Sequence, residues 1–257
     1  MAQKRWKKRL GLVLGRRRLL RDASFLHVLN EDEGKLLEPL RLGTPMVVVP
    51  NGVFAAEVGK RPNPGRFYLR YPQLENSPYI LFLSRLHYKK GLDFLAAMFA
   101  KVASAIPEVR LVVVGPDGGA LADFEGRVRN AGFANRVLVT GPLYGSAKSE
   151  ALADAACFCL PSRQEGFSMA ITEALAIGCP VLITENCHFP EVATAGAGLV
   201  VPLSVAELAD AASRILRSSA LRTRMGQEGL ALVRKSYTWE RISEYLEAAY
   251  RRHFRTR

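Results

Sequence analysis

The sequence predicts a doubly wound α/β domain built on a parallel sheet, together with part of a second α/β domain. Three observations support this prediction. From Tyr79 onward, strand-sized apolar runs alternate with helical stretches, which is typical of βαβ units with right-handed crossovers. The runs are nearly continuous rather than alternating, as expected for strands covered on both faces. The 257 residues are 49% hydrophobic and 23% charged, which excludes disordered chains and disulfide-stabilised small proteins.

Six strands are expected in the larger domain, each an apolar run that ends in a loop. They are residues 80–84, 111–114, 137–140, 157–160, 181–184 and 199–201. Apolar residues at helical spacing predict helices between them, at 92–104, 120–130, 147–154 and 168–177. After Pro202 the pattern is helical, with a long final helix over 237–252. The expected architecture is a doubly wound, Rossmann-like parallel sheet.

Residues 1–50 follow a different pattern. Strands are expected at 25–29 and 45–49, on either side of a helix over 31–40, which is too little to close a sheet around its own core. A stretch rich in Gly, Pro and Asn follows, as is typical of a linker. We therefore expect four segments. They are the remnant of an N-terminal α/β domain at 1–52, a linker at 53–78, the main domain at 79–235 and a C-terminal helix at 236–257.

The net charge of +12 lies at the two ends of the chain. Residues 1–21 carry nine Lys or Arg and no acid, and residues 251–257 carry four Arg, whereas 22–250 hold 23 basic and 24 acidic residues. Such ends are most often solvated helix faces, but they can also bind lipid phosphates. Four apolar residues are set among the N-terminal cations, namely Trp6, Leu10, Val13 and Leu14. An anionic membrane surface is therefore a candidate partner. No nucleic-acid partner is expected, because no recognition motif or stacking platform accompanies the charge.

The four cysteines are expected to be reduced core thiols. Cys157 and Cys159 lie two apart in an apolar strand, and no CxxC pair or zinc-ligand spacing occurs. The apolar run after the basic N-terminus is too short for a secretion signal and is followed by three arginines. We therefore expect a cytoplasmic protein. The basic ends of the chain make peripheral attachment to the inner face of the membrane a further expectation.

Ligands of open parallel sheets bind outside the carboxyl ends of the strands, so the loops that leave those ends are the candidate site. Arg85, Lys89 and Lys90 follow the first strand, and three cations just before a helix suit a diphosphate. Gly115 opens a tight loop after the second strand, where backbone can approach a ligand closely. Taken alone, the cationic loop is equally compatible with a solvated surface, and the loop at Gly115 is neither a GxGxxG motif nor a P-loop.

The loop after the fourth strand, residues 161–168, is the most informative. Ser168 is placed to cap the following helix, and free amides at a helix N-terminus attract phosphate oxygens. Glu165 lies on the loop and Glu173 lies inside the helix, about 7–8 Å along the axis from Ser168 at 1.5 Å per residue. Two acidic acceptors beside a phosphate site match a nucleotide sugar, because its diphosphate has hydroxyl-bearing rings on both sides.

Several of these elements, in this order and spacing, resemble the donor-binding half of family 4 (group 1) glycosyltransferases, which are retaining enzymes of the GT-B fold. The resemblance extends from Tyr79 to about Pro202. The matching pieces are Ser84-Arg85-Leu86, Lys90-Gly91, Gly115, Thr140-Gly141, the Glu165–Glu173 element, Ala176–Val181 and Phe189–Val192.

The resemblance implies a role for each matching residue. Arg85 and Lys90 would hold the donor diphosphate and stabilise charge on the leaving nucleotide, and Glu165 would contact the donor sugar. These three are the implied catalytic residues. The implied donor-binding residues are Gly115, Leu143, Gly166, Phe167, Ser168, Met169 and Glu173. Among them, Leu143 would grip the base through its backbone and Glu173 would bond the ribose hydroxyls. The resemblance favours a UDP-linked donor, with GDP and ADP as alternatives.

No DxD motif occurs in the sequence, so we expect neither a metal nor a cofactor beyond the nucleotide sugar that is the substrate. The family's glycine-rich loop and active-site His find no match, and His27 is expected to be buried in its strand. We therefore expect a glycosyltransferase whose chain is incomplete for catalysis. The alternative is a non-catalytic nucleotide-sugar-binding subunit that meets an acceptor-binding chain, a second copy of itself or a membrane surface.

Overall fold

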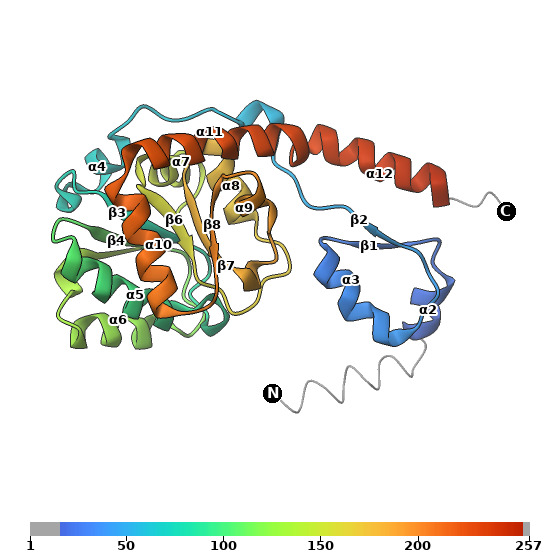
Figure 1. The fold of residues 1–257 in the computed structure, drawn as a ribbon, viewed down its shortest axis with the longest axis horizontal. Coiled ribbons are helices and arrows are strands. Elements are labelled where there is room, and N and C mark those ends of the chain that lie inside the picture. Colours follow the sequence, from blue (N-terminus) through green and yellow to red (C-terminus); the bar gives the residue numbers. More distant parts are fainter. Residues whose placement is uncertain (1–15, 254–257) are drawn as a thin grey trace. The chain divides into compact units, whose positions relative to one another are not determined.

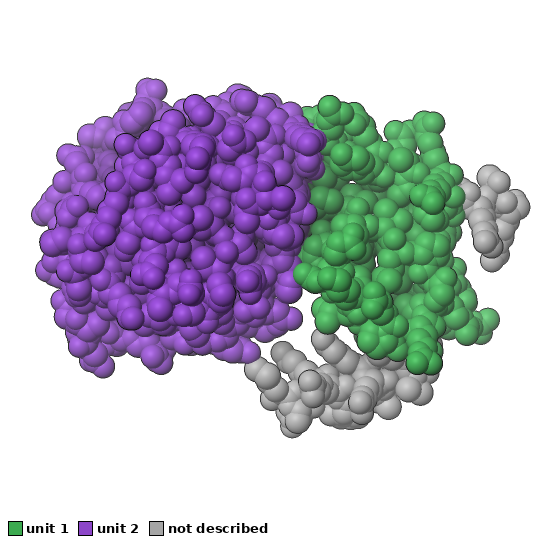
Figure 2. Space-filling view, viewed as in Figure 1, with its two compact units in different colours: residues 1–51, 239–257 green, residues 52–238 purple. Residues whose placement is uncertain are grey.

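The computed structural model describes residues 16–253, which form two compact units (Figures 1 and 2). Unit 2 comprises residues 52–238. Unit 1 comprises residues 1–51 and 239–257, of which 1–15 and 254–257 lie outside the described part. The residues that suggested a membrane-binding stretch, Trp6, Leu10, Val13 and Leu14, fall there. Among residues 16–253, no helix is long and apolar enough to cross a bilayer.

Unit 2 is built on a six-stranded parallel sheet with the strand order β5-β4-β3-β6-β7-β8 (Figure 1). The strands are β3 (Tyr79–Leu83), β4 (Arg110–Val114), β5 (Val137–Gly141), β6 (Cys157–Leu160), β7 (Val181–Thr184) and β8 (Gly198–Val201). The chain runs outward from β3 through β4 to β5 and then returns to place β6 on the other side of β3. This order has its topological switch point between β3 and β6, where open α/β sheets bind their ligands.

Helices cover both faces of this sheet. One layer contains α5 (Leu92–Ala105), α6 (Leu121–Asn130) and α10 (Val205–Arg217). The other contains α4 (Arg66–Arg70), α7 (Gly145–Asp154), α8 (Met169–Ile177) and α11 (Ser219–Ser236), while α9 (Glu191–Thr194) leads into β8. Strand side chains such as Ile80, Leu81 and Phe82 are fully buried, because helices pack on both sides of them. The predicted doubly wound architecture is confirmed, and each predicted strand end lies within one residue of the observed one.

Residues 53–78 do not form the predicted linker. They contain η3 (Ala55–Glu57), α4 and η4 (Pro72–Leu74), and all belong to unit 2. The Asp154 carboxylate accepts hydrogen bonds of 2.8 Å from the backbone N–H groups of Gly65 and Phe67, and the Phe67 and Leu74 side chains are fully buried. The prediction was wrong because the Gly and Pro residues here shape tight turns around buried side chains.

Unit 1 contains two short parallel strands, β1 (Leu26–Val28) and β2 (Met46–Val48), with the helices α2 (Arg17–Asp22), α3 (Glu31–Leu37), η2 (Glu38–Leu40) and α12 (Trp239–His253). The Asn30 side chain accepts from the Glu33 N–H at 2.8 Å, and the Glu33 carboxylate accepts from the Leu29 N–H at 2.7 Å. The Asn30 cap starts α3 where the sequence predicted a helix, and Glu33 connects its first turn to the residue before the cap. The expected final helix is α12, and it groups with unit 1.

His27 is exposed, which corrects the expectation that it is buried. Leu26 and Val28 on either side of it are buried, so strand alternation turns the imidazole outward. Its Nε2 atom lies 2.6 Å from the Val49 carbonyl oxygen. The expectation for the cysteines is met, since all four are free and buried in unit 2.

Candidate functional site

The loops that leave β3 and β6 meet at the switch point of the sheet. Gly91 has a φ of +69°, and a Cβ atom placed on it would lie 1.9 Å from the Pro161 carbonyl oxygen. The Arg163 N–H donates to the Lys89 carbonyl oxygen at 2.7 Å. Only glycine fits at position 91, so the Lys90-Gly91 pair in the sequence marks a close approach of two loops far apart in the chain.

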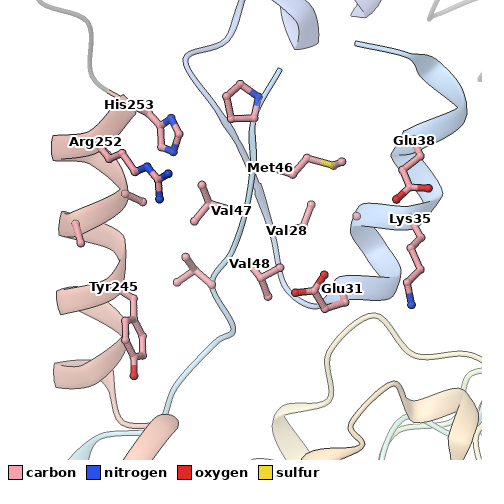
Figure 3. A pocket seen from close by; sticks show the side chains of 15 residues that line it. Val28, Glu31, Lys35, Glu38, Met46, Val47, Val48, Tyr245, Arg252 and His253 are labelled. Carbon is pink, nitrogen blue, oxygen red and sulfur yellow. The ribbon is translucent and has the colours of Figure 1, made fainter. Parts of the chain in front are cut away.

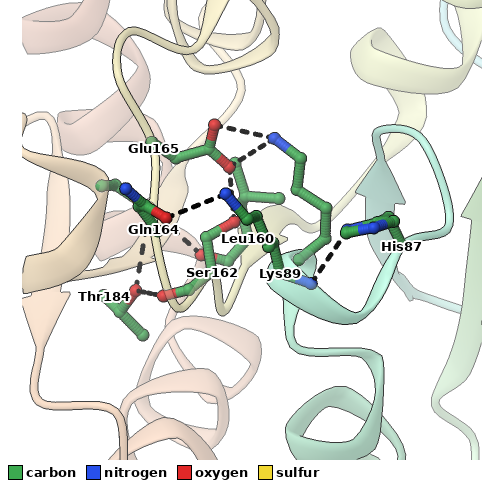
Figure 4. Close-up of polar contacts among 9 residues, drawn as sticks. His87, Lys89, Leu160, Ser162, Gln164, Glu165 and Thr184 are labelled. Atoms are coloured by element: carbon green, nitrogen blue, oxygen red, sulfur yellow. Dashed lines mark hydrogen bonds and ion pairs between the residues drawn. The ribbon is translucent and has the colours of Figure 1, made fainter. Parts of the chain in front are cut away.

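These loops bring Lys90 and Glu165 into direct contact (Figure 4 labels Glu165). The Lys90 ammonium lies 2.6 and 2.7 Å from the two Glu165 carboxylate oxygens. The exposed fractions of the two side chains are 17% for Lys90 and 6% for Glu165. A hydrogen bond of 2.5 Å from the Ser162 hydroxyl also reaches Glu165, and the Glu165 N–H donates to the Asn186 carbonyl at 3.0 Å. Lys90 and Ser162 therefore hold the carboxylate, and the bond to Asn186 holds the Glu165 backbone, at the point where the two loops meet.

The floor beneath this pair is polar and fully buried. Ser162 and Thr184 are completely inaccessible, and the Thr184 hydroxyl donates to the Ser162 carbonyl at 2.6 Å. The Cys187 thiol lies 3.5 Å from the Leu160 carbonyl oxygen. These bonds fix the start of the loop after β6 to the end of β7. Ser162 was not predicted as a site residue, although it lies within the loop 161–168.

Glu173, the second predicted acid, has a cationic partner of its own. Its carboxylate accepts from the Lys148 ammonium of α7 at 2.8 Å, and the two side chains are 27% and 30% exposed. Both residues line a cavity of about 410 Å³ between α7, α8 and the segment that contains η3. Lys148 was missed because a lysine in a helix is usually solvated and its spacing gives no signal.

The N-terminus of α8 matches the prediction in position but not in capping. Ser168 is the N-cap residue, but its own side chain makes no capping hydrogen bond. Its carbonyl instead accepts from Ile171 and Thr172 within the first turn. Phe167 places its ring 5.6 Å from Phe189 and 6.3 Å from Tyr237, and Met169 is partly buried against the core. Side chains therefore anchor this turn, and the Ser168 side chain does not cap its first backbone amides.

Arg85, Gly115 and Leu143 lie on the β3, β4 and β5 side of the switch point. Arg85 is exposed, with its Cγ atom beside Gly118, and no hydrogen bond or ion pair of its guanidinium is found among residues 16–253. A Cβ atom on Gly115 would lie 1.9 Å from the Ser84 carbonyl oxygen. The glycine is thus required by the contact between two loops of the protein itself. Leu143 is partly buried against the core, and Gly166 is exposed.

A second cavity lies in unit 1 and has a different character. It measures about 710 Å³ and is lined by charged residues of α3 and α12 and by the strand β2. Figure 3 shows Met46, Val47 and Val48 between the two helices. Met46 and Val48 are 41% and 38% exposed, so apolar side chains of unit 1 face solvent. The expectation that residues 1–52 meet a partner chain or a second copy stays a prediction.

No set of three His, Cys, Asp or Glu side chains that could hold a metal ion is found in the described part of the chain.

Known proteins resemble this chain in sequence and fold. Residues 70–231 match the family model described as glycosyl transferases group 1. A phosphatidyl-myo-inositol mannosyltransferase of Mycobacterium leprae is 29% identical over 213 residues, which are 81% of this chain and 54% of the relative. A GDP-mannose-dependent monoacylated alpha-(1-6)-phosphatidylinositol monomannoside mannosyltransferase of Corynebacterium glutamicum is 30% identical over 67% of this chain and 46% of the relative. This chain spans about half the length of these relatives.

Solved structures show the same fold. The sucrose-phosphate synthase of Thermosynechococcus elongatus has a TM-score of 0.80 at 24% identity, over 94% of this chain and 61% of that one. Anabaena Alr3699/HepE in complex with UDP-glucose has a TM-score of 0.77 at 20% identity, over 93% and 67% of the two chains. The family model spans well over half of the chain and covers both loops of the switch point. The chain belongs to the group 1 glycosyl transferases.

Proposed function

We propose that unit 2 binds a nucleotide-diphosphate sugar at the switch point and supplies the donor side of a glycosyl transfer that retains the configuration of the sugar. The observation that carries the proposal is the Lys90–Glu165 contact, 2.6 Å long and largely buried, where the loops after β3 and β6 meet. A cation for phosphate and an acceptor for sugar hydroxyls stand side by side there, next to a helix N-terminus that the Ser168 side chain does not cap. Such a helix end favours phosphate oxygens.

In this proposal Arg85 and Lys90 bind the diphosphate, and Lys90 moves from Glu165 to a phosphate oxygen when the donor arrives. Glu165 is then free to accept from hydroxyls of the donor sugar. The backbone of Gly166, Phe167, Ser168 and Met169 contacts sugar and phosphate. The nucleoside lies toward Glu173 and Leu143, with Glu173 bonding the ribose hydroxyls. The cavity of about 410 Å³ beside Glu173 supports this direction, and Gly115 keeps the neighbouring loop close.

The proposed reaction breaks the bond between the sugar C1 atom and the β-phosphate oxygen, and the electron pair leaves with the nucleoside diphosphate. The acceptor hydroxyl oxygen bonds to C1 on the same face of the ring, and its proton passes to the departing phosphate oxygen. Negative charge grows on the diphosphate as it leaves. Arg85 and Lys90 bring positive charge to that position, which is where charge stabilisation lowers the barrier.

The donor we propose first is UDP-linked. Structures of similar fold have been solved with UDP and with UDP-glucose. The Corynebacterium relative is named GDP-mannose-dependent, so GDP-mannose is the second donor to test. Either donor presents the same diphosphate to Lys90 and Arg85, and the two differ in the base that Leu143 and the cavity beside Glu173 would read.

Calorimetric titration tests the proposed site. The chain is titrated with UDP, GDP, ADP, UDP-glucose and GDP-mannose, and Glu173→Ala is compared with Glu75→Ala. Glu75 pairs with Arg110 at the opposite end of the strands, so it serves as the matched control. We expect one nucleotide to bind saturably and Glu173→Ala to weaken it about 10- to 100-fold, as for the loss of a charge-assisted hydrogen bond. If no nucleotide binds the folded chain, or both variants weaken it equally, the proposed site is wrong.

We also infer that unit 1 works at an anionic membrane surface, at the cytoplasmic face. The relatives named as phosphatidyl-myo-inositol mannosyltransferases support this, as do the exposed Arg17, Arg18 and Leu19 of α2. Lys and Arg near an anionic surface each contribute about 1 kcal/mol. Co-sedimentation with phosphatidylserine vesicles that weakens at high salt is expected. Equal binding to uncharged phosphatidylcholine vesicles, or none to either, would contradict it.

A further inference from the structure

Arg163 and Asp93 form an ion pair that joins the two sides of the switch point. Arg163 lies on the loop after β6, and Asp93 is the second residue of α5, which follows β3. The two guanidinium NH₂ groups of Arg163 donate to the two Asp93 carboxylate oxygens at 2.7 and 2.6 Å. This two-pronged geometry restricts both the distance and the orientation of the partners. The pair therefore fixes the loop after β6 to the start of the helix after β3.

Further contacts hold the Arg163 guanidinium in place. One of its NH₂ groups also donates to the Tyr88 carbonyl oxygen at 2.9 Å. Its central carbon lies 4.9 Å from the centre of the Phe94 ring and 5.9 Å from that of Tyr88. A planar guanidinium can form two parallel hydrogen bonds to one carboxylate and stack on a ring at the same time, whereas a lysine ammonium cannot. Arginine is thus specified by its surroundings at position 163.

The backbone and the neighbouring side chains repeat the same connection. The Arg163 N–H donates to the Lys89 carbonyl at 2.7 Å, and the Lys89 ammonium donates to the Gln164 side-chain oxygen at 3.0 Å (Figure 4). Lys89 is adjacent to Lys90, and Gln164 is adjacent to Glu165. Each member of the Lys90–Glu165 pair is therefore flanked by a residue bonded to the opposite loop.

We propose that Arg163 and Asp93 are positioning residues that set the separation and orientation of Lys90 and Glu165 for a nucleotide sugar, without touching it. The inference rests on the proposed function of that site. The sugar hydroxyls can bond to Glu165 only if its carboxylate lies in a defined place. The flexible Lys90 side chain, by contrast, can adjust to reach the phosphates of a nucleoside diphosphate that carries no sugar. Loss of the Arg163–Asp93 pair should therefore weaken the binding of a nucleotide sugar more than the binding of the corresponding nucleoside diphosphate.

The pair is suited to a local role rather than to holding the whole domain together. Its side chains are 30% and 31% exposed, and partly exposed ion pairs contribute little to global stability. Variants of Arg163 and Asp93 are therefore expected to fold. The hydrogen bond from Arg163 lowers the pKa of the Asp93 carboxyl below its ordinary range, which agrees with a pair that persists at neutral pH.

The first arm of the test compares the dissociation constants of a nucleotide sugar and its nucleoside diphosphate, UDP-glucose with UDP and GDP-mannose with GDP. The proteins are the wild-type chain, Arg163→Ala, Arg163→Lys, Asp93→Asn and the control Arg110→Ala. Arg110 pairs with Glu75 at the amino end of β4. In the first three variants we expect the preference for the sugar-bearing ligand to fall by about 10- to 100-fold, the equivalent of one charge-assisted hydrogen bond. The control should keep the wild-type preference.

Arg163→Lys separates positioning from charge. This variant keeps the positive charge but cannot form the two parallel hydrogen bonds to Asp93. It should therefore fail to restore the preference for the nucleotide sugar over the nucleoside diphosphate. If Arg163→Ala weakens the binding of both ligands equally, the pair has a general structural role and the positioning inference is wrong. If it weakens neither, the inference is also wrong.

The second arm needs no ligand. Amide hydrogen exchange is measured over residues 84–91 and 161–168 in the wild-type chain, Arg163→Ala and Arg110→Ala. We expect faster exchange in both segments in Arg163→Ala alone, including the Glu165 amide that donates to Asn186. Unchanged exchange would overturn the inference. If the wild-type chain binds no nucleotide while the exchange result holds, the proposed function fails and the positioning of Lys90 and Glu165 stands.

Discussion

Lys90 and Glu165, 75 residues apart in the sequence, meet with a 2.6 Å contact between the loops that leave two adjacent strands. Their surroundings are unequal. The Glu165 side chain is 6% exposed and that of Lys90 is 17% exposed, and a lysine can also extend its ammonium toward water. Removing one partner of a buried pair leaves the other charge uncompensated. The damage should therefore depend on which partner is removed.

We predict that Lys90→Met destabilises unit 2 by about 3 kcal/mol, because it leaves the Glu165 carboxylate buried and without its cation. Glu165→Gln should destabilise it by only about 1 kcal/mol, since Lys90 can reach solvent. Urea unfolding of both single variants and of the double variant measures this. The double variant should be more stable than Lys90→Met. Equal losses in the two single variants would show that the unequal burial has no energetic effect.

The fold and part of the site could be predicted because continuous apolar runs mark buried parallel strands and the residues after each run share one edge of the sheet. Lys90 and Glu165 both follow such runs, so they were expected at the same edge. The ion-pair partners Asp93, Lys148 and Arg163 could not be predicted, because charged residues near helix starts are usually solvated and their pairing depends on loop geometry. It also misread residues 53–78, where the burial of Phe67 is visible only once Asp154 is seen to hold the turn.

Gly91→Ala tests the close approach of the two loops. The added Cβ atom would lie 1.9 Å from the Pro161 carbonyl oxygen, and the φ of +69° is unfavourable for alanine. Gly119 has a similar constraint, with a φ of +93°, but no atom within 4 Å of its virtual Cβ. We expect Gly119→Ala to show only the backbone effect, about 1–2 kcal/mol, and Gly91→Ala to exceed it clearly. Denaturant midpoints that are equal for the two variants would exclude a steric contact at Pro161.

Phe67→Ala tests whether residues 53–78 belong to unit 2. The Phe67 side chain is fully buried, with its ring 4.8 Å from Tyr71 and 5.6 Å from Tyr79. Truncating such a ring typically destabilises a domain by about 3–5 kcal/mol. Leu69, which is 75% exposed in the same helix, supplies the control Leu69→Ala with a change below about 0.5 kcal/mol. Thermal unfolding followed by circular dichroism compares them. A true linker would leave both variants unchanged.

The cysteines predict how the protein behaves in alkali. Burial raises the pKa of the Cys179 and Cys187 thiols to about 12, from an ordinary value of 9.0. Above pH 9 the unfolded chain loses thiol protons that the folded chain keeps, so stability should fall from pH 9 toward pH 12. The slope is at most about 1.4 kcal/mol per pH unit for each thiol. Urea midpoints between pH 7.5 and 10.5 measure this, and Cys179→Ala should reduce the slope.

Below pH 9 neither the Cys179 nor the Cys187 thiol should react with iodoacetamide unless the chain is unfolded. Rapid labelling of the native protein would contradict their burial.

Asp93 predicts the behaviour in acid. The hydrogen bond from Arg163 lowers the pKa of its carboxyl below the ordinary value of 3.8. A lowered pKa means that the pair stabilises the folded state above about pH 3.8 and loses that contribution as the pH falls through the folded pKa. The difference in unfolding free energy between the wild-type chain and Asp93→Asn should thus be constant from pH 8 to pH 5 and shrink below pH 4. The pair is about one-third exposed, so the difference should not exceed about 1 kcal/mol. Asp123→Asn removes a more exposed ion pair with Arg127 and should give a smaller difference throughout. A difference for Asp93→Asn that persists unchanged to pH 3 would mean that the contribution comes from packing around the side chain, because only the carboxylate charge is lost on protonation.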